Sequence, residues 1–165
     1  MTEITLSQLN DICLNVVAAY DPGDPLMNAF LYLMYNTGLR SNEVMQLNRY
    51  TNGPPEYYTA LLEKGNGTRD IELIYALPVL QNLVLNGALF NPYTYSALQY
   101  SIGKASPVVT FGSNTNRSLG HMFRYRFIKQ LGDDGLSIPE IMEITKQSST
   151  TTVEIYLNDL IYTHP

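Results

Sequence analysis

The sequence contains no tryptophan, only one cysteine and two histidines, and no apolar run of about 18 residues that could cross a membrane. One cysteine cannot form an internal disulfide, and Cys13 falls on the apolar side of a predicted helix, so we interpret it as a small buried side chain. The polar, acidic first residues show no secretory signal. These absences predict a soluble cytoplasmic protein with no membrane partner.

Basic residues are scarce and unevenly distributed along the chain. The net charge is −5, residues 1–39 contain no base, and residues 73–132 contain no acid. Two interpretations stay open: the asymmetry arises by chance, or the acid-free segment forms a basic face that binds a polyanion. In either case the negative total predicts a weaker electrostatic attraction to nucleic acid than a basic domain has. The bases of the acid-free segment are Lys104, Arg117, Arg124, Arg126 and Lys129.

The length and the apolar content are those of one folded domain. With 165 residues, 45% of them hydrophobic, the chain is long enough to bury a core and short enough to form a single domain. No internal repeat, low-complexity tract or linker marks a second domain. We therefore assign residues 1–165 to one domain.

Hydrophobic periodicity and end signals predict a mostly helical α+β protein with a small antiparallel sheet. Asp24 is a suitable N-cap for a helix that begins with Pro25, and this helix is apolar nearly all round, which predicts burial. The runs 56–63 and 69–75 predict two strands joined by a glycine-containing hairpin loop. A loop is predicted over 106–116. The predicted helices cover residues 5–19, 26–36, 41–47, 78–86, 92–105, 117–131, 138–145 and 150–161.

Four separate stretches carry side chains suited to binding or attacking a phosphate. Arg40 follows a Thr-Gly-Leu turn, and Lys64 stands in the predicted hairpin loop. His121 and Arg124 are three residues apart, which places both on one face of a helix. Tyr156 follows a run of serine and threonine. Each has an ordinary structural alternative: an ion pair at a helix start, a solvated turn lysine, a surface pair, and one packed tyrosine among 13.

Taken in order, these stretches resemble the motifs of the tyrosine recombinases, the phage-integrase and Xer-type family. The resemblance covers about residues 25–156. It implies the tyrosine-recombinase catalytic-domain fold, and a site-specific recombinase that cleaves and rejoins DNA strands through a 3′-phosphotyrosine. The stretches that carry it are TGLRSNEVMQL at 37–47, LEKGNGTRDIEL at 62–73, HMFRYRF at 121–127 and KQSSTTTVEIY at 146–156.

The resemblance also implies a role for each residue. Arg40 and Arg124 would offer planar sets of donors to the non-bridging phosphate oxygens, and Tyr156 would attack the phosphorus. His121 would accept or relay the phenol proton, and Lys64 would protonate the departing 5′-oxygen. Such chemistry requires no metal ion or cofactor, and no His, Cys, Asp or Glu cluster shows the spacing of metal ligands.

Two residues near Tyr156 depart from the family pattern. Gln147 stands where the family has His or Trp, and Lys146 stands where it usually has Gly. An amide still donates a hydrogen bond to a phosphate oxygen, but it carries neither a charge nor a proton, so slower chemistry is expected. Two alternatives stay open: a catalytically weak or inactive recombinase-derived module that binds DNA or a partner, and a relaxing topoisomerase of the related type IB class.

The remaining expectations concern DNA and partners. Only about 24 residues precede the motif-bearing part, so no N-terminal core-binding domain is expected, as in the minimal fimbrial-switch invertases. The expected partners are double-stranded DNA, further copies of the chain on DNA, and a companion recombinase or DNA-binding protein. A phage or mobile element is the expected source, with the host cytoplasm or nucleoid as the location. The candidate contacts to the DNA backbone are Arg69, Lys104, Arg117, Arg126 and Lys129.

Overall fold

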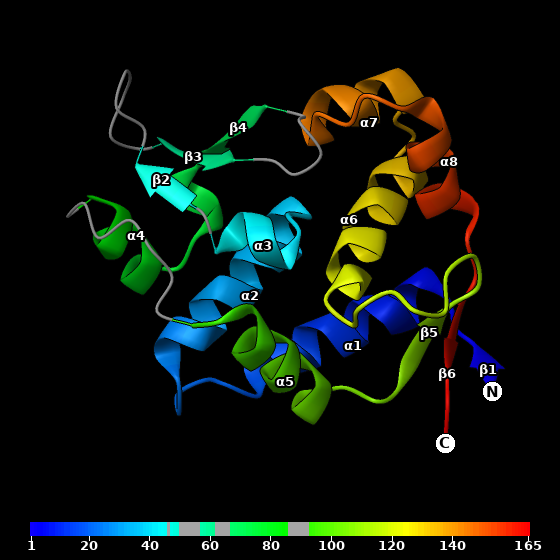
Figure 1. Ribbon diagram of the computed structural model, residues 1–165, viewed down its shortest axis with the longest axis horizontal. Coiled ribbons are helices and arrows are strands. Elements are labelled where there is room, and N and C mark those ends of the chain that lie inside the picture. Colours follow the sequence, from blue (N-terminus) through cyan, green and yellow to red (C-terminus); the bar gives the residue numbers. More distant parts are fainter. Residues whose placement is uncertain (46, 50–56, 62–66, 86–92) are drawn as a thin grey trace.

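The computed structural model describes residues 1–45, 47–49, 57–61, 67–85 and 93–165. Helices make up most of it, and a three-stranded antiparallel sheet lies on either side of them (Figure 1), which confirms the predicted fold class. None of the helices in these ranges has the length and apolar character needed to cross a bilayer. The helices are α1 (Leu6–Ala18), α2 (Pro25–Thr37), α3 (Ser41–Val44), the 3-10 turn η1 (Leu73–Tyr75), α4 (Pro78–Leu85), α5 (Tyr95–Ala105), α6 (His121–Asp133), α7 (Ile138–Thr145) and α8 (Thr150–Asn158).

The helix ends follow from short local signals in the sequence. At the start of α1 the Thr5 hydroxyl accepts the Gln8 backbone N–H, and the Gln8 side chain accepts the Thr5 backbone N–H, which closes a capping box. Ser137 and Glu140 form the same box at α7. Asp24 caps α2, as predicted. A cap of this kind stabilises its helix by about 1 kcal/mol.

Helix α2 lies at the centre of the hydrophobic core. Its side chains are buried nearly all round, which confirms the prediction, and it packs against α1, α4 and α6. Burial of each large apolar side chain stabilises the fold by roughly 1.5–3 kcal/mol, so this helix firmly fixes its own C-terminal end, where the predicted site begins. Cys13 of α1 is buried in the same core, as predicted. The buried apolar residues of α2 are Met27, Ala29, Phe30, Leu31, Leu33 and Met34.

The predicted hairpin belongs to the first sheet. Strands β3 (Tyr57–Leu61) and β4 (Thr68–Glu72) pair antiparallel, and β2 (Leu47–Arg49) pairs with the other edge of β3, so the strand order is β2-β3-β4. The predicted helix over 41–47 is therefore too long, since α3 ends at Val44 and the chain is extended again from Leu47. Lys64, the predicted general acid, lies between β3 and β4 and outside the described residues.

The second sheet was not predicted. Strands β1 (Thr2–Glu3), β6 (Ile161–Thr163) and β5 (Val109–Phe111) pair antiparallel in the order β1-β6-β5, which places both chain ends side by side (Figure 1). The predicted loop over 106–116 and the predicted helix through residue 161 are wrong at these strands. Strands of two or three residues are too short for a detectable apolar alternation, and their partners come from opposite ends of the chain.

Helix α6 begins at His121 rather than at residue 117, and a loop over 112–120 precedes it. The loop ends in a turn in which the His121 backbone N–H donates to the Ser118 carbonyl at 3.1 Å. Gly120 allows a close approach to α3, because a Cβ atom there would lie 2.5 Å from Ser41 Oγ. The loop is thereby held against the start of α3.

Candidate active site

A glycine turn at the end of α2 positions the first predicted arginine. Gly38 has a φ of 69°, a left-handed conformation that glycine adopts readily at a helix end. A Cβ atom at this position would also overlap the Phe127 ring of α6. The turn therefore lets the chain leave α2 in close contact with α6 and places Arg40 at the N-cap of α3.

Arg40, Glu43 and Arg124 form a buried charge cluster. Their exposed fractions are 8%, 1% and 2%. Arg40 Nη1 lies 3.3 Å from Glu43 Oε2, so the ion pair named above as the structural alternative for Arg40 is present, and Arg124 Nη1 lies 4.0 Å from Glu43 Oε1. Within this trio one carboxylate faces two guanidiniums, so the three side chains together carry a net positive charge.

Arg124 is also tied to the glycine turn. Its Nη1 donates to the Gly38 carbonyl at 2.8 Å, whereas its buried Nε has no hydrogen-bond partner in the described part of the chain. Burial and the charge of Arg40 lower the pKa of Arg124, while Tyr156 and Glu43 act in the opposite direction. An unpaired buried donor costs about 1–3 kcal/mol, so this guanidinium lacks one acceptor in the free protein.

A cavity of about 110 Å³ opens beside the charge cluster. At roughly 30 Å³ per water molecule it offers the space of three or four waters, on the scale of one phosphate group. Arg40, His121 and Arg124 all line it, so the structure brings three of the predicted catalytic side chains to one cavity. The other residues that line it are Ser41, Asn42, Tyr95, Ser118 and Gly120.

His121 is electrically neutral at neutral pH. Its pKa is lowered from 6.5 to about 4, first by burial and then by the charges of Arg117, Arg40 and Arg124, while a hydrogen bond to the Ser118 backbone acts in the opposite direction. The ring nitrogen Nδ1 also lies 3.0 Å from Ser118 Oγ. A neutral imidazole has a nitrogen lone pair, but burial and the neighbouring cations make it a weak base in the free protein, so the proposed role as proton acceptor requires a bound anion that offsets those charges.

Acid is expected to destabilise the fold through His121. The unfolded chain binds the proton at about pH 6.5, whereas the folded protein resists it down to about pH 4, so stability falls as the pH drops through this window and is unaffected above it. At about 1.4 kcal/mol per pKa unit the loss is at most about 3 kcal/mol. The loss is measured by urea unfolding at neutral and acidic pH, with His121→Asn beside the parent. The variant should lack this part of the pH dependence of the unfolding free energy.

The matched control is His164→Asn, which removes the other histidine and keeps His121. This variant should retain the full acid sensitivity assigned to His121, and its remaining imidazole resonance can be titrated by NMR. A midpoint at the ordinary histidine value would show that the ring is neither buried nor surrounded by cations.

Tyr156 lies next to the cluster but does not line the cavity. Its ring is 2% exposed on α8, with the Arg117 guanidinium 4.9 Å and the Arg124 guanidinium 5.5 Å from the ring centroid. Tyr125 packs edge-on against the same ring at a centroid distance of 4.7 Å. The structure thus joins Tyr156 to the cavity through Arg124 and keeps the phenol covered.

The two residues that depart from the family pattern lie in the turn between α7 and α8. Lys146 has a φ of 59° and caps α7 in the left-handed conformation, which explains why a glycine would suit this position. Gln147 is 5% exposed, accepts the Thr145 hydroxyl at 3.0 Å, and has a buried Nε2 without a hydrogen-bond partner among the residues described. Like Tyr156, it does not line the cavity.

The side chains predicted to contact the DNA backbone differ in whether contacts within the fold hold them or leave them exposed. Three of them donate to backbone carbonyl groups inside the fold: Arg69, Arg126 and Lys129. Arg117 packs against two tyrosine rings, and Lys104 is exposed in the last turn of α5. Contact with DNA stays a prediction for all five.

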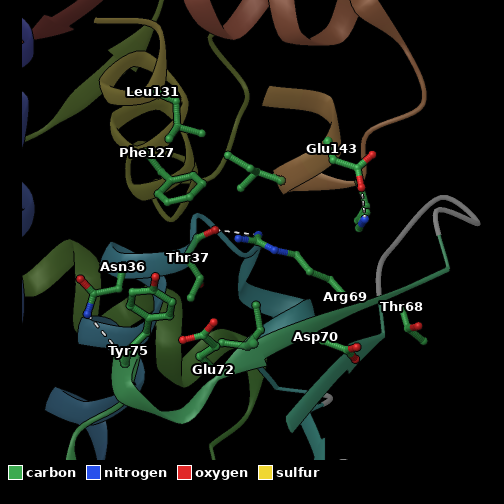
Figure 2. Close-up of a pocket in the computed structure, with 13 residues that line it drawn as sticks. Asn36, Thr37, Thr68, Arg69, Asp70, Glu72, Tyr75, Phe127, Leu131 and Glu143 are labelled. Carbon is green, nitrogen blue, oxygen red and sulfur yellow. Dashed lines mark hydrogen bonds and ion pairs between the residues drawn. The ribbon is translucent and has the colours of Figure 1, made fainter. Parts of the chain in front are cut away.

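A larger cavity of about 810 Å³ lies between β4 and helices α6 and α7 (Figure 2). Arg69 extends across it from β4, donates to the Thr37 carbonyl at 2.7 Å, and holds its guanidinium 5.6 Å from the Phe127 ring. Acids outnumber bases around this cavity, which disfavours an anionic ligand, so the smaller cavity is the candidate phosphate site. The charged residues that line the larger cavity are Arg69, Asp70, Glu72, Glu143 and Lys146.

Sequence reasoning missed residues that shape the smaller cavity through tertiary contacts. Tyr95 and Ser118 line it, and Gln99 joins its walls by donating to Ser41 Oγ at 2.7 Å and accepting the Gly120 backbone N–H at 3.2 Å. No local pattern marks these residues, since each depends on how α5 and the loop over 112–120 meet α3. Among the residues that the structure describes, no group of three or more His, Cys, Asp or Glu side chains could hold a metal ion.

Comparison with known proteins gives matches in structure but not in sequence. No protein-family model matches the chain, and no curated protein does. The structure of XerA recombinase matches with a TM-score of 0.66 at 20% identity, over 90% of this chain and 58% of that one. A lambda integrase dimer bound to a COC′ core site matches with a TM-score of 0.62 at 12% identity, over 95% of this chain and 59% of that one. XerH site-specific recombinase in a pre-cleavage complex with its difH substrate matches with a TM-score of 0.60 at 20% identity, over 90% of this chain and 48% of that one.

These similarities establish the fold. The chain has the catalytic-domain fold of tyrosine recombinases, which confirms the resemblance drawn from its motifs. It spans about half to three fifths of the length of the recombinases it matches.

Proposed function

We propose that the chain is a site-specific DNA recombinase that cleaves and rejoins strands through a 3′-phosphotyrosine at Tyr156. The observation that supports this most is the shared site: Arg40 and Arg124 line a phosphate-sized cavity with a neutral His121, and Arg124 also lies against the Tyr156 ring. Double-stranded DNA is the proposed substrate, because recombinases of the same fold have been solved bound to a difH substrate and to a COC′ core site.

In the proposed reaction, the non-bridging oxygens of one phosphodiester enter the cavity and accept hydrogen bonds from Arg40 and Arg124. The hydroxyl oxygen of Tyr156 attacks the phosphorus, a bond from phosphorus to the phenol oxygen forms, and the bond to the 5′-oxygen breaks. His121 accepts the phenol proton, and Lys64 gives a proton to the departing 5′-oxygen. Attack by a 5′-hydroxyl reverses the steps and frees Tyr156, so no energy source is consumed.

The proposal requires movement around Tyr156. Because its ring is 2% exposed and lies outside the cavity, the phenol must be uncovered when DNA binds. The unpaired Nε2 of Gln147 is then free to donate to a phosphate oxygen. We further propose that residues 1–165 act as one catalytic domain, and that further copies of the chain or a companion protein assemble with it on DNA.

The test is capture of the covalent intermediate. The chain is incubated with a pool of nicked duplexes of randomised sequence, and protein–DNA adducts that resist detergent are isolated and sequenced. Since no lysine or arginine follows Lys146, trypsin leaves the DNA on a peptide that contains both Tyr156 and Tyr162, and fragmentation separates the two. We expect the DNA on Tyr156, and Tyr162→Phe should form the adduct as the parent does.

Two results would count against the proposal. DNA linked to any other tyrosine contradicts the assignment of the nucleophile. Binding of duplexes without any adduct contradicts the enzyme and leaves a recombinase-derived binding module in its place.

A further inference from the structure

Arg117 contacts the proposed nucleophile from the loop that precedes α6. Its guanidinium lies 4.9 Å from the ring centroid of Tyr156 and 5.5 Å from that of Tyr125. Within the described residues its side chain makes no hydrogen bond, and its Nη1 is buried without a partner. Contacts with two aromatic rings, rather than hydrogen bonds, therefore locate this guanidinium.

The second ring under Arg117 is itself fixed. Tyr125 stacks on Phe111 of β5 at a centroid distance of 4.5 Å with an angle of 4° between the rings. Its hydroxyl donates to the Asp159 carboxylate at 2.5 Å, and Asp159 also accepts the Ser113 backbone N–H at 2.7 Å. Arg117 thus spans a rigid ring and the Tyr156 ring, which suits a side chain that holds the second against the first.

We propose that Arg117 is a positioning residue that fixes the ring of Tyr156 for attack on the phosphate, rather than a contact to the DNA backbone. The proposal rests on the proposed function. Its guanidinium is partly buried against two rings, and Arg117 does not line the cavity that Arg40 and Arg124 share. Its charge also reaches His121, because Arg117 is the strongest of the charges that lower the pKa of that ring, so it lies among the reacting groups.

The two roles predict different kinetics. Loss of a cation–ring contact at a partly buried site should slow adduct formation at saturating DNA by about tenfold, with half-saturation little changed. Loss of a phosphate contact should instead weaken binding and reduce the salt dependence of affinity by about one counterion, with the saturating rate kept. Arg117→Ala is therefore measured on a duplex selected from the randomised pool, with Arg117→Lys beside it to separate charge from planar stacking.

A second readout does not depend on DNA. In the free protein, 3-fluorotyrosine placed at position 156 reports the ring environment by fluorine NMR. We expect Arg117→Ala to shift this resonance, Arg117→Lys to shift it as well, and Lys104→Ala to leave it unchanged, because Lys104 is exposed on α5.

Each outcome decides the proposal. A slower saturating rate together with a shifted resonance supports it. The proposal is overturned if Arg117→Ala leaves the resonance unmoved. It is also overturned if Arg117→Ala lowers the affinity for DNA and its salt dependence while the saturating rate is unchanged. If no duplex yields an adduct, the proposed function fails and the positioning role fails with it, while the shifted resonance shows only that Arg117 contacts the ring.

Discussion

Arg124→Ala is expected to lower the rate of adduct formation at saturating DNA by a factor of about 10²–10³, the usual effect of removing one preorganised donor from a developing anion. The guanidinium is 2% exposed and fixed by the Gly38 carbonyl at 2.8 Å, so it is already oriented before DNA arrives. It also lies 5.5 Å from the Tyr156 ring centroid. The variant therefore loses both a phosphate donor and a support of the nucleophile.

The controls for this variant separate catalysis from folding. Urea unfolding shows whether the buried cation is also needed for stability, and rates are compared only between folded proteins. Arg124→Lys keeps the charge but lacks the planar pair of donors, so an intermediate rate is expected. Arg126→Ala is the matched control, because Arg126 lies on the same helix and donates to the Tyr35 carbonyl, away from the cavity. A folded Arg124→Ala protein that cleaves at the parent rate contradicts the proposed site.

Much of the helical part of the fold is predictable because its signals are local. The Thr5 and Ser137 capping boxes, and Asp24 before Pro25, lie within four residues of the helix ends that they set. The sheet of β1, β5 and β6 is not predictable in this way. Its strands are two or three residues long, and each is stable only because its partner arrives from a distant part of the chain.

The candidate site also has a part that local sequence predicts and a part that depends on tertiary contacts. The residue types in the motifs follow from phosphate chemistry, and the structure adds the reason for their neighbours: Gly38 permits contact with Phe127, and Lys146 occupies a left-handed helix end. Which direction a cation points is a tertiary property. Arg69 lies in the motif stretch 62–73 and is a predicted contact to the DNA backbone, yet its guanidinium is buried against Thr37 and Phe127. The sequence therefore identifies the charged residues, but it does not predict which of them face a ligand.

Glu43→Gln is expected to destabilise the protein by about 3–5 kcal/mol, the usual effect of removing one partner from a buried ion pair. The carboxylate is 1% exposed and lies 3.3 Å from Arg40 Nη1 and 4.0 Å from Arg124 Nη1. Glutamine has nearly the same shape and keeps an oxygen to accept the Arg40 backbone N–H, so the change removes mainly the negative charge. Two buried guanidiniums would then face each other without that carboxylate between them.

Urea unfolding measures this effect, and an unchanged slope shows that the surface exposed on unfolding is the same. The matched control is Glu143→Gln, which breaks a pair with Lys146 at 3.0 Å on the surface, where Glu143 is 82% exposed. Such exposed pairs contribute about 0–1 kcal/mol, so the control should be nearly neutral. Equal losses in the two variants would mean that the buried carboxylate is not what holds the arginines together.

A large loss confined to Glu43→Gln would instead show that Arg40 and Arg124 repel each other in the site once the carboxylate charge is removed, and a bound phosphate would relieve this repulsion. Inorganic phosphate or sulfate should then restore part of the lost stability in Glu43→Gln and have little effect on Glu143→Gln.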